Sequence, residues 1–155
     1  MWRELITELT RDAQPIGDLQ PGPDFAPGAT QEQIEEVERA LGVRLPGSPR
    51  SLLGESNGVQ ACFGTPLIFS TDELIRTNRE MREESTYRET WMPFDHLLFF
   101  GAAGVDGEMF AFPIIEGRID RDQVYVWIPN RDDREWRAGS LRAYVEWSLK
   151  GPLRA

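Results

Sequence analysis

Residues 27–58 read PGATQEQIEEVERALGVRLPGSPRSLLGESNG, and this stretch predicts two helices joined by a tight corner. Thr30 and Gln33 have the spacing of a capping box, in which both side chains accept hydrogen bonds from backbone N–H groups at the start of a helix. Apolar residues that recur every three or four positions would form one buried stripe: Ile34, Val37 and Leu41. Gly42 is expected to end this helix in a left-handed conformation.

The second helix of the stretch is expected to begin at Ser48 and Pro49, as its cap and its first residue. Gly54 lies inside it, and a glycine there costs about 1 kcal/mol relative to alanine, so we expect this helix to be short or irregular. Asn57-Gly58 would stop it. Two short helices cannot bury their apolar faces alone, so the rest of the chain must pack on them.

This pattern resembles the signature of the Smi1/Knr4 (SUKH) family, which combines a helix, a Leu-Gly turn, Leu-Pro, a second short helix and Asn-Gly. The matching positions are Ile34, Glu38, Leu41, Gly42, Leu45, Pro46, Leu52, Leu53, Asn57 and Gly58. The resemblance continues in 101–112, GAAGVDGEMFAF, and in 124–127, so that it covers roughly residues 30–149. Pro49 departs from the family, which usually has an aromatic residue there.

The rest of the chain predicts a mixture of helices and antiparallel strands. Ser70 and Glu73 form a second capping box, and three apolar runs with short connections favour an antiparallel meander. The expected elements are a helix over 1–11, a Pro- and Gly-rich loop over 12–28, one or two strands within 59–69, a helix over 70–84, strands at 97–100, 109–115 and 124–128, an exposed loop over 130–137, and a helix that begins after Ser140.

The length of 155 residues predicts a single domain over 1–155, with an N-terminal helix and Pro/Gly-rich strap (1–29) before a family core (30–150). The fold class is α+β. It is a mainly antiparallel sheet of about four to six strands, partly wrapped by about four to five helices, as the resemblance also implies.

The net charge of −9 bears on the partners of the protein. Such an acidic chain repels phosphate backbones, so nucleic-acid binding is not expected. It suits a basic partner through electrostatic steering, although solubility alone also explains acidity. The apolar runs are too short to cross a bilayer, and the start of the chain lacks a secretory signal, so we expect no membrane insertion and a cytoplasmic location.

The sequence predicts no catalytic residues, no cofactor and no metal. Its single cysteine and single histidine, Cys62 and His96, would need mutual contact and a third orienting group to act as nucleophile and base. Asp95 beside His96 would raise the histidine pKa if the two groups met. The glycines at 101, 104 and 107 are interpreted as a hairpin turn, because a nucleotide loop would be followed by a helix.

Partner contacts are predicted for exposed acids and for aromatic residues near them. Glutamates four residues apart repel each other on a helix and mark a solvated face or a binding surface. Aromatic residues are enriched at binding hot spots, but they also fill cores, as the segment with Trp91, Met92 and Phe94 illustrates. The candidates are Glu32, Glu36, Glu80, Glu84, Trp91, Asp106, Glu108, Asp132, Asp133 and Trp136.

The family resemblance implies an immunity protein, because many bacterial members neutralise a cognate secreted toxin by binding it. The acidic charge would match a toxin with a basic surface, such as a nuclease. The alternatives are a regulatory scaffold, as in the fungal relatives, and a cryptic hydrolase. The hydrolase would need a cleft with two facing carboxylates of shifted pKa, which composition alone does not select.

Overall fold

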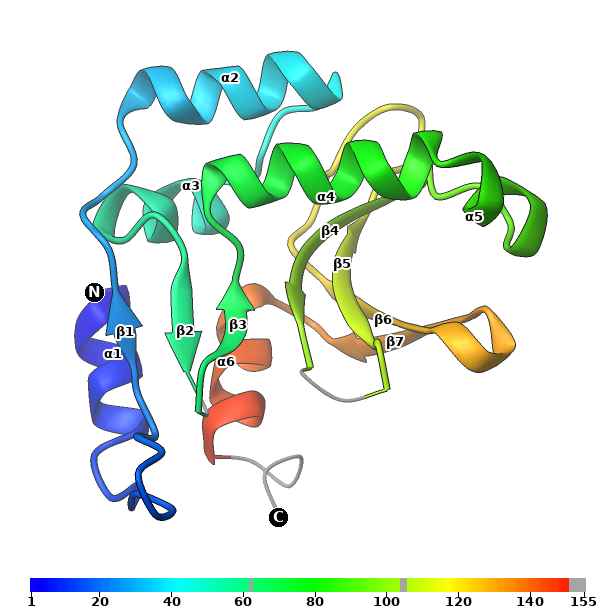
Figure 1. The fold of residues 1–155 in the computed structure, drawn as a ribbon. Coiled ribbons are helices and arrows are strands. Elements are labelled where there is room, and N and C mark those ends of the chain that lie inside the picture. Colours follow the sequence, from blue (N-terminus) through cyan, green and yellow to red (C-terminus); the bar gives the residue numbers. More distant parts are fainter. Residues whose placement is uncertain (62, 104–105, 151–155) are drawn as a thin grey trace.

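The chain forms two antiparallel sheets with helices packed around them, and this confirms the α+β class (Figure 1). The computed structural model describes residues 1–61, 63–103 and 106–150. The helices are α1 (Trp2–Leu9), α2 (Gln31–Leu41), α3 (Gly47–Glu55), α4 (Thr71–Glu83), α5 (Ser85–Thr90), α6 (Leu141–Lys150) and the 3-10 turn η1 (Pro129–Arg131). The three-stranded sheet has the strand order β1 (Asp24–Phe25), β2 (Val59–Ala61), β3 (Thr65–Ile68). The four-stranded sheet has the order β4 (Leu97–Ala102), β5 (Met109–Pro113), β6 (Val124–Ile128), β7 (Asp133–Ala138).

The α2–α3 corner follows the predicted caps at its start but not at its second helix. The Thr30 hydroxyl accepts from the Gln33 N–H at 3.1 Å, the Gln33 amide oxygen accepts from the Thr30 N–H at 2.9 Å, and Gly42 ends α2 at φ 67°. The predicted short helix α3 is present, but its predicted start was wrong, because it begins at Gly47 with Pro46 as its cap. Pro49 then lies in the first turn, where the missing N–H of proline removes no helical bond.

The segment before α2 is more than the surface loop that we predicted. Its end forms β1, which pairs with β2, and the Asn57 N–H donates to the Pro27 carbonyl at 3.0 Å. A Cβ on Gly28 would lie 2.1 Å from the Gly54 carbonyl oxygen, so only glycine permits this close approach. Glu55, at the end of α3, accepts the backbone N–H groups of Trp2 and Arg3 and thereby holds α1 in place.

Helix α4 joins the two sheets where β3 and β4 lie side by side. It begins in the predicted capping box of Ser70 and Glu73, and the Phe69 N–H donates to the Phe100 carbonyl at 2.7 Å. Asn78 is a buried polar side chain on the inner face of this helix. Its amide donates to the Phe99 carbonyl at 2.9 Å and accepts from the Phe99 N–H at 2.8 Å, which satisfies the open edge of β4.

The predicted meander is present as β4, β5 and β6, but the exposed loop predicted over 130–137 was wrong. This segment forms η1 and then β7, which pairs with β6 through Tyr125 opposite Trp136 and Trp127 opposite Arg134. Its charged composition is typical of an exposed loop, which is why the strand was missed. Edge strands often carry such charged residues, because they discourage pairing with other chains. The short helix α5 was also missed.

Helix α6 packs against one face of the four-stranded sheet. The Tyr144 ring lies 4.8 Å from the Phe110 ring and 5.1 Å from the Phe100 ring, and its hydroxyl donates to the Leu67 carbonyl of β3 at 2.9 Å. The buried apolar side chains of both sheets and the helices form one continuous core. Among the described residues, no helix has the length and apolar character that a bilayer crossing requires.

Candidate partner-binding surface

Several predicted contact residues meet at one end of the four-stranded sheet, where α5 and η1 lie close together (Figure 1). The loop 91–96 runs from α5 into β4 and is held by η1 and the start of β7. The Trp91 indole donates to the Pro129 carbonyl at 3.1 Å, and the Met92 N–H donates to the Asp132 carboxylate at 2.9 Å. These hydrogen bonds fix the loop against the end of the sheet. We call the loop 91–96, η1 and residues 132–134 the frame.

Asp132 is the centre of this frame. It has a left-handed backbone at φ 53° in the turn before β7. Its carboxylate accepts from the Met92 N–H, from the Trp127 indole at 2.9 Å and from the Arg134 guanidinium at 2.8 Å. Burial alone would raise the pKa of Asp132, but the hydrogen bonds from these donors and the Arg134 charge lower it below its ordinary value. The Asp132 carboxylate thus forms these hydrogen bonds within its own chain.

Arg134 completes the frame, and sequence reasoning did not single it out. It donates to the Met92 carbonyl at 2.7 Å and to the Pro93 carbonyl at 2.8 Å, and its guanidinium lies 4.4 Å from the centre of the Phe94 ring. It also lies 3.2 Å from His96 Nε2. Burial and the Arg134 charge lower the pKa of His96 and outweigh the opposite effect of the Asp95 and Asp132 charges.

The aromatic side chains of the frame are divided between core and surface. Phe94 is fully buried, and the half-buried Trp91 ring packs edge-on against Trp127 with centroids 4.9 Å apart. These two residues therefore serve the packing that we considered as the alternative to partner contact. Met92 differs from both, because it is 64% exposed.

Trp136 is the exposed aromatic residue beside this frame. It lies on β7 with 57% of its surface exposed, directly opposite the half-buried Tyr125 of β6. Residues two apart on a strand share a face, so Trp136 lies on the same side as Arg134 and the loop that it holds. We call Met92, Tyr125 and Trp136 the Trp136 surface. The predicted contact residue Asp133 points to the other face of β7, where it pairs with Arg131.

The Trp136 surface points away from α6. Phe110 pairs with Val126, the residue next to Tyr125, so Phe110 and Tyr125 point to opposite faces of the sheet. Since Phe110 contacts Tyr144 of α6, the face that carries Tyr125 and Trp136 is the other one. The exposed Trp147 of α6 therefore belongs to a different surface from Trp136.

The family model SUKH_6, described as SMI1-KNR4 cell-wall, matches residues 31–145 of the chain. The chain belongs to the SMI1-KNR4 (SUKH) family. No curated protein matches it. Two residues that carry the resemblance to this family fix the backbone of the scaffold through their side chains. The Glu38 carboxylate accepts from the Leu45 N–H at 2.7 Å, and the Asn57 side chain binds the N–H and hydroxyl of Thr71.

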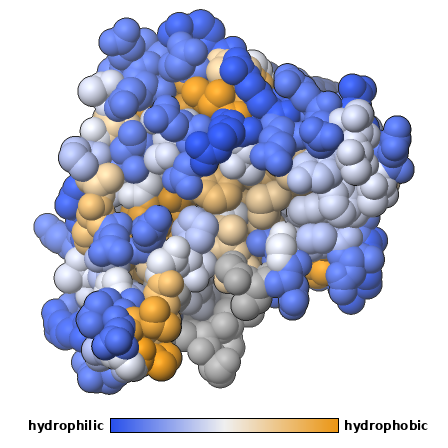
Figure 2. All heavy atoms as spheres, in the orientation of Figure 1, coloured by the Kyte–Doolittle hydropathy of each residue, from blue (hydrophilic) through white to orange (hydrophobic). Residues whose placement is uncertain are grey.

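The remaining predicted contact acids of this SUKH protein lie away from the Trp136 surface. Glu32 and Glu36 are exposed on α2, where Glu36 pairs with Arg39 at 2.8 Å. This helix lies beside α4 at the top of Figure 1, and the same region is largely hydrophilic in Figure 2. Asp106 and Glu108 follow β4 in the turn to β5, and Glu108 lines a cavity.

Glu80 and Glu84 lie nearer the frame but not on one helical face. Helix α4 ends at Glu83, so Glu84 has left the helix. Its carboxylate instead caps α5 by accepting from the Thr86 N–H at 3.5 Å, and it also accepts from the Thr86 hydroxyl at 3.2 Å. The Glu80 charge raises the pKa of Tyr87, whose hydroxyl lies 3.4 Å from its carboxylate. The like-charge pair predicted on a common helix was therefore wrong.

The structure offers the hydrolase hypothesis no support. Among the described carboxylates, Asp132 and Glu55 have a shifted pKa. Asp132 lies between η1 and β7 and Glu55 at the end of α3, so the two belong to separate parts of the fold (Figure 1). In Glu55, burial raises the pKa, but hydrogen bonds from the Arg3 and Trp2 N–H groups and the nearby N-terminus lower it. Within 1–61, 63–103 and 106–150 no group of acids, histidines and cysteines could hold a metal ion. Cys62 of the considered Cys62–His96 pair lies outside the described residues.

Proposed function

We propose that this SUKH protein is a binding protein of the immunity type, which neutralises a cognate protein toxin by covering the surface with which the toxin acts. The Trp136 surface would be the centre of the contact. Membership of the SUKH family supports the class of function. The exposure of Trp136 beside a loop that is fixed by Asp132 and Arg134 supports the choice of surface.

The exposed Trp136 is the observation that carries the proposal. Tryptophan and tyrosine dominate binding hot spots, because a large rigid ring buries much apolar area at little entropic cost. Trp136 pairs across the strands with Tyr125, and Met92 adds a flexible apolar side chain at the edge. Since the frame is already ordered, little conformational entropy is lost when a partner binds there.

The charge of the chain favours a basic partner. The net charge of the chain is −9. Asp133 and Glu135 alternate with Arg134 and Trp136 along β7, so they lie on its other face, where they pair with Arg131. A toxin that binds nucleic acid through a basic surface would be attracted to such a protein, and its active surface would be the part that is covered. A stable complex buries roughly 1,200 to 2,000 Å² in total, so contacts must extend beyond Trp136, and Glu80 and Glu84 near α5 are candidates.

The test is binding to the toxin encoded beside the gene of this protein. Isothermal titration calorimetry should detect a complex, and Trp136→Ala should weaken it by about thirtyfold or more, as expected for a hot spot of 2 kcal/mol. Trp147→Ala is the matched control, because it removes an exposed tryptophan from α6 on the other side of the sheet and should leave the affinity unchanged.

Cell survival gives the functional measurement. Cells that express the toxin should be rescued by the wild-type protein and by Trp147→Ala, and more weakly by Trp136→Ala. If micromolar protein forms no complex and rescues no cells, the immunity function is wrong. If both tryptophan variants bind equally well, the function stands but the Trp136 surface is the wrong surface.

A further inference from the structure

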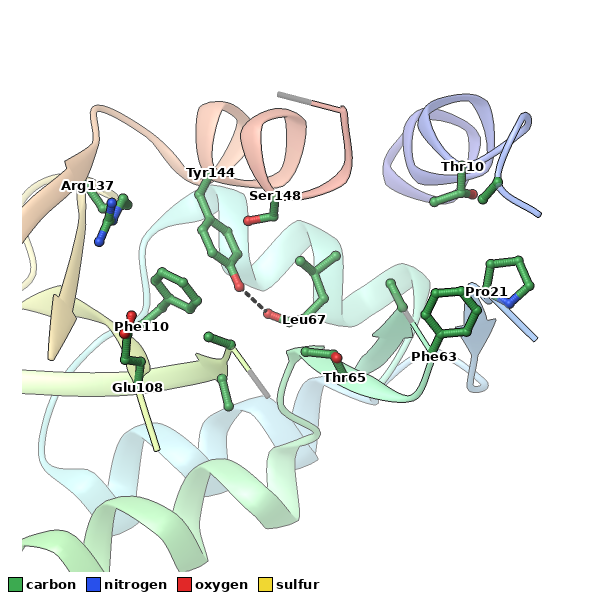
Figure 3. A pocket seen from close by; sticks show the side chains of 14 residues that line it. Thr10, Pro21, Phe63, Thr65, Leu67, Glu108, Phe110, Arg137, Tyr144 and Ser148 are labelled. Carbon is green, nitrogen blue, oxygen red and sulfur yellow. Dashed lines mark hydrogen bonds between the residues drawn. The ribbon is translucent and has the colours of Figure 1, made fainter. Parts of the chain in front are cut away.

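A cavity of about 440 Å³ lies between the two sheets and is separate from the Trp136 surface (Figure 3). Its volume is within the range of small-molecule sites in proteins. The walls come from both sheets, from α6 and from the segment before β1, and they are mainly apolar. Pro21 and Phe63 lie at one end, Leu67 lies along the middle, and Phe110 and Arg137 lie toward the other end (Figure 3).

Arg137 is the positively charged residue of this wall, and its guanidinium lacks a partner among the described residues. Its Nε is buried without a hydrogen bond, and the described part of the chain provides it with no ion pair. Arg134, two residues earlier, has its guanidinium bonded to carbonyls and a carboxylate. A buried donor without an acceptor is costly, so such a group is expected to have one in the working state of the protein.

The backbone of β7 explains how Arg137 reaches the cavity. Trp136 pairs with Tyr125 and Ala138 pairs with Val124, so Arg137 is the extra residue of a bulge. Bulges redirect side chains and are frequent next to functional sites. Trp136 and Arg137 are thereby consecutive in sequence, one on the exposed surface and the other in the cavity wall.

The geometry points to this cavity as a binding site for a small amphipathic monocarboxylate. The carboxylate would pair with the fork of Arg137, which matches its two oxygens. The apolar chain would lie along Phe110 and Leu67 toward Phe63. Glu108 lies near the Arg137 end and would repel a second negative charge there, so nucleotides and phosphates fit poorly. The second charge of a dicarboxylate would lie near Phe63 among apolar side chains, without a partner.

Isothermal titration calorimetry of the full chain tests this with decanoate as the probe. Decanol has the same chain without the charge, and decanedioate adds a second charge. Decanoate should bind at one site. Decanol should bind about tenfold more weakly or worse because it lacks the charge-assisted hydrogen bonds to Arg137, and decanedioate because its second charge would be buried without a partner. The result does not depend on the toxin, so it can fail while the immunity function stands.

Substitutions assign the binding to the cavity. Arg137→Gln should weaken the binding of decanoate by about tenfold to a hundredfold and leave the affinity for decanol unchanged. Arg142→Gln is the control, because Arg142 is exposed on α6 and pairs with Glu146. If thermal unfolding shows that Arg137→Gln is not folded, Ser148→Leu is the second variant. It narrows the cavity from α6 and should weaken decanoate binding. Absence of saturable decanoate binding to the wild type, or unchanged affinity in the folded variant, would overturn the assignment.

Discussion

Replacing Asp132 by asparagine should destabilise the protein through a single hydrogen-bond conflict. Every partner of the Asp132 carboxylate is a donor: the Met92 N–H on one oxygen, and the Trp127 indole and Arg134 on the other. An amide offers one acceptor and one donor, so either orientation of the asparagine side chain turns an N–H group toward another N–H group. The backbone conformation at this turn, with φ 53°, is one that asparagine accepts, so strain does not contribute.

The size of the effect follows from the bonds that are lost. The cheaper orientation loses the Met92 bond, and a hydrogen bond to a charged group is worth about 1.5 to 3 kcal/mol. We therefore expect Asp132→Asn to lower the free energy of unfolding by about 2 to 3 kcal/mol at pH 7, out of a total of about 5 to 15 kcal/mol. Urea unfolding followed by tryptophan fluorescence measures this directly.

Asp133→Asn is the matched control, because Asp133 is the next residue and its partner Arg131 is exposed. Exposed ion pairs contribute at most about 1 kcal/mol, so this variant should unfold close to the wild type. The pKa of Asp132 is lowered in the folded protein, so its bonds stabilise the fold above the ordinary carboxyl pKa and lose their effect as the pH falls through the folded pKa. The difference between wild type and Asp132→Asn should shrink in acid. Equal midpoints for the two variants at pH 7 would refute the argument.

Three further outcomes are expected. Asn78→Leu should lower the free energy of unfolding by about 2 to 6 kcal/mol, because the Phe99 N–H and carbonyl lose their partner in a buried place, and a thermal midpoint equal to that of the wild type would contradict it. Gly54→Ala should stabilise by about 0.5 to 1 kcal/mol in urea, since its Cβ meets open space, whereas Gly28→Ala should destabilise. Toxin association measured by stopped flow should slow steeply between low and physiological salt, and a flat response would exclude charge steering.

The helices were predictable where their signals are local. The capping boxes at Thr30 and Ser70 and the left-handed Gly42 involve neighbours within three or four residues, so the sequence displays them directly. The start of α3 was misplaced because Pro46 and Pro49 both fit a helix N-terminus, and only packing of the corner selects the first.

The strands β1 and β7 were not predictable, because their evidence lies in distant partners. β1 spans two residues and exists because β2 provides backbone groups for it. β7 contains four charged residues among its six, and its pairing with β6 determines that the segment is extended. A polar segment beside a sheet edge has no periodicity that distinguishes a strand from a loop.

The candidate surface was partly predictable for the same reason. Trp136 could be chosen from its type and its acidic neighbours. The role of Asp132 could not, because its donor at Met92 is 40 residues away. His96 shows the same limit: the charge of its sequence neighbour Asp95 acts to raise its pKa, but burial and Arg134, 38 residues away, lower it.

Glu38 and Asn57, two positions that carry the family resemblance, act at a distance from the proposed contact surface, and this has a consequence for specificity. Glu38 holds the backbone of the α2–α3 corner, and Asn57 holds the start of α4, so substitutions there would damage the scaffold itself. The side chains of Trp136 and Met92 are largely exposed instead. The scaffold can therefore stay constant while these side chains change. If a toxin is recognised as proposed, exchanging the exposed residues of β7 and the loop 91–96 should redirect binding without loss of stability, whereas exchanging the corner should lower stability without creating a new partner.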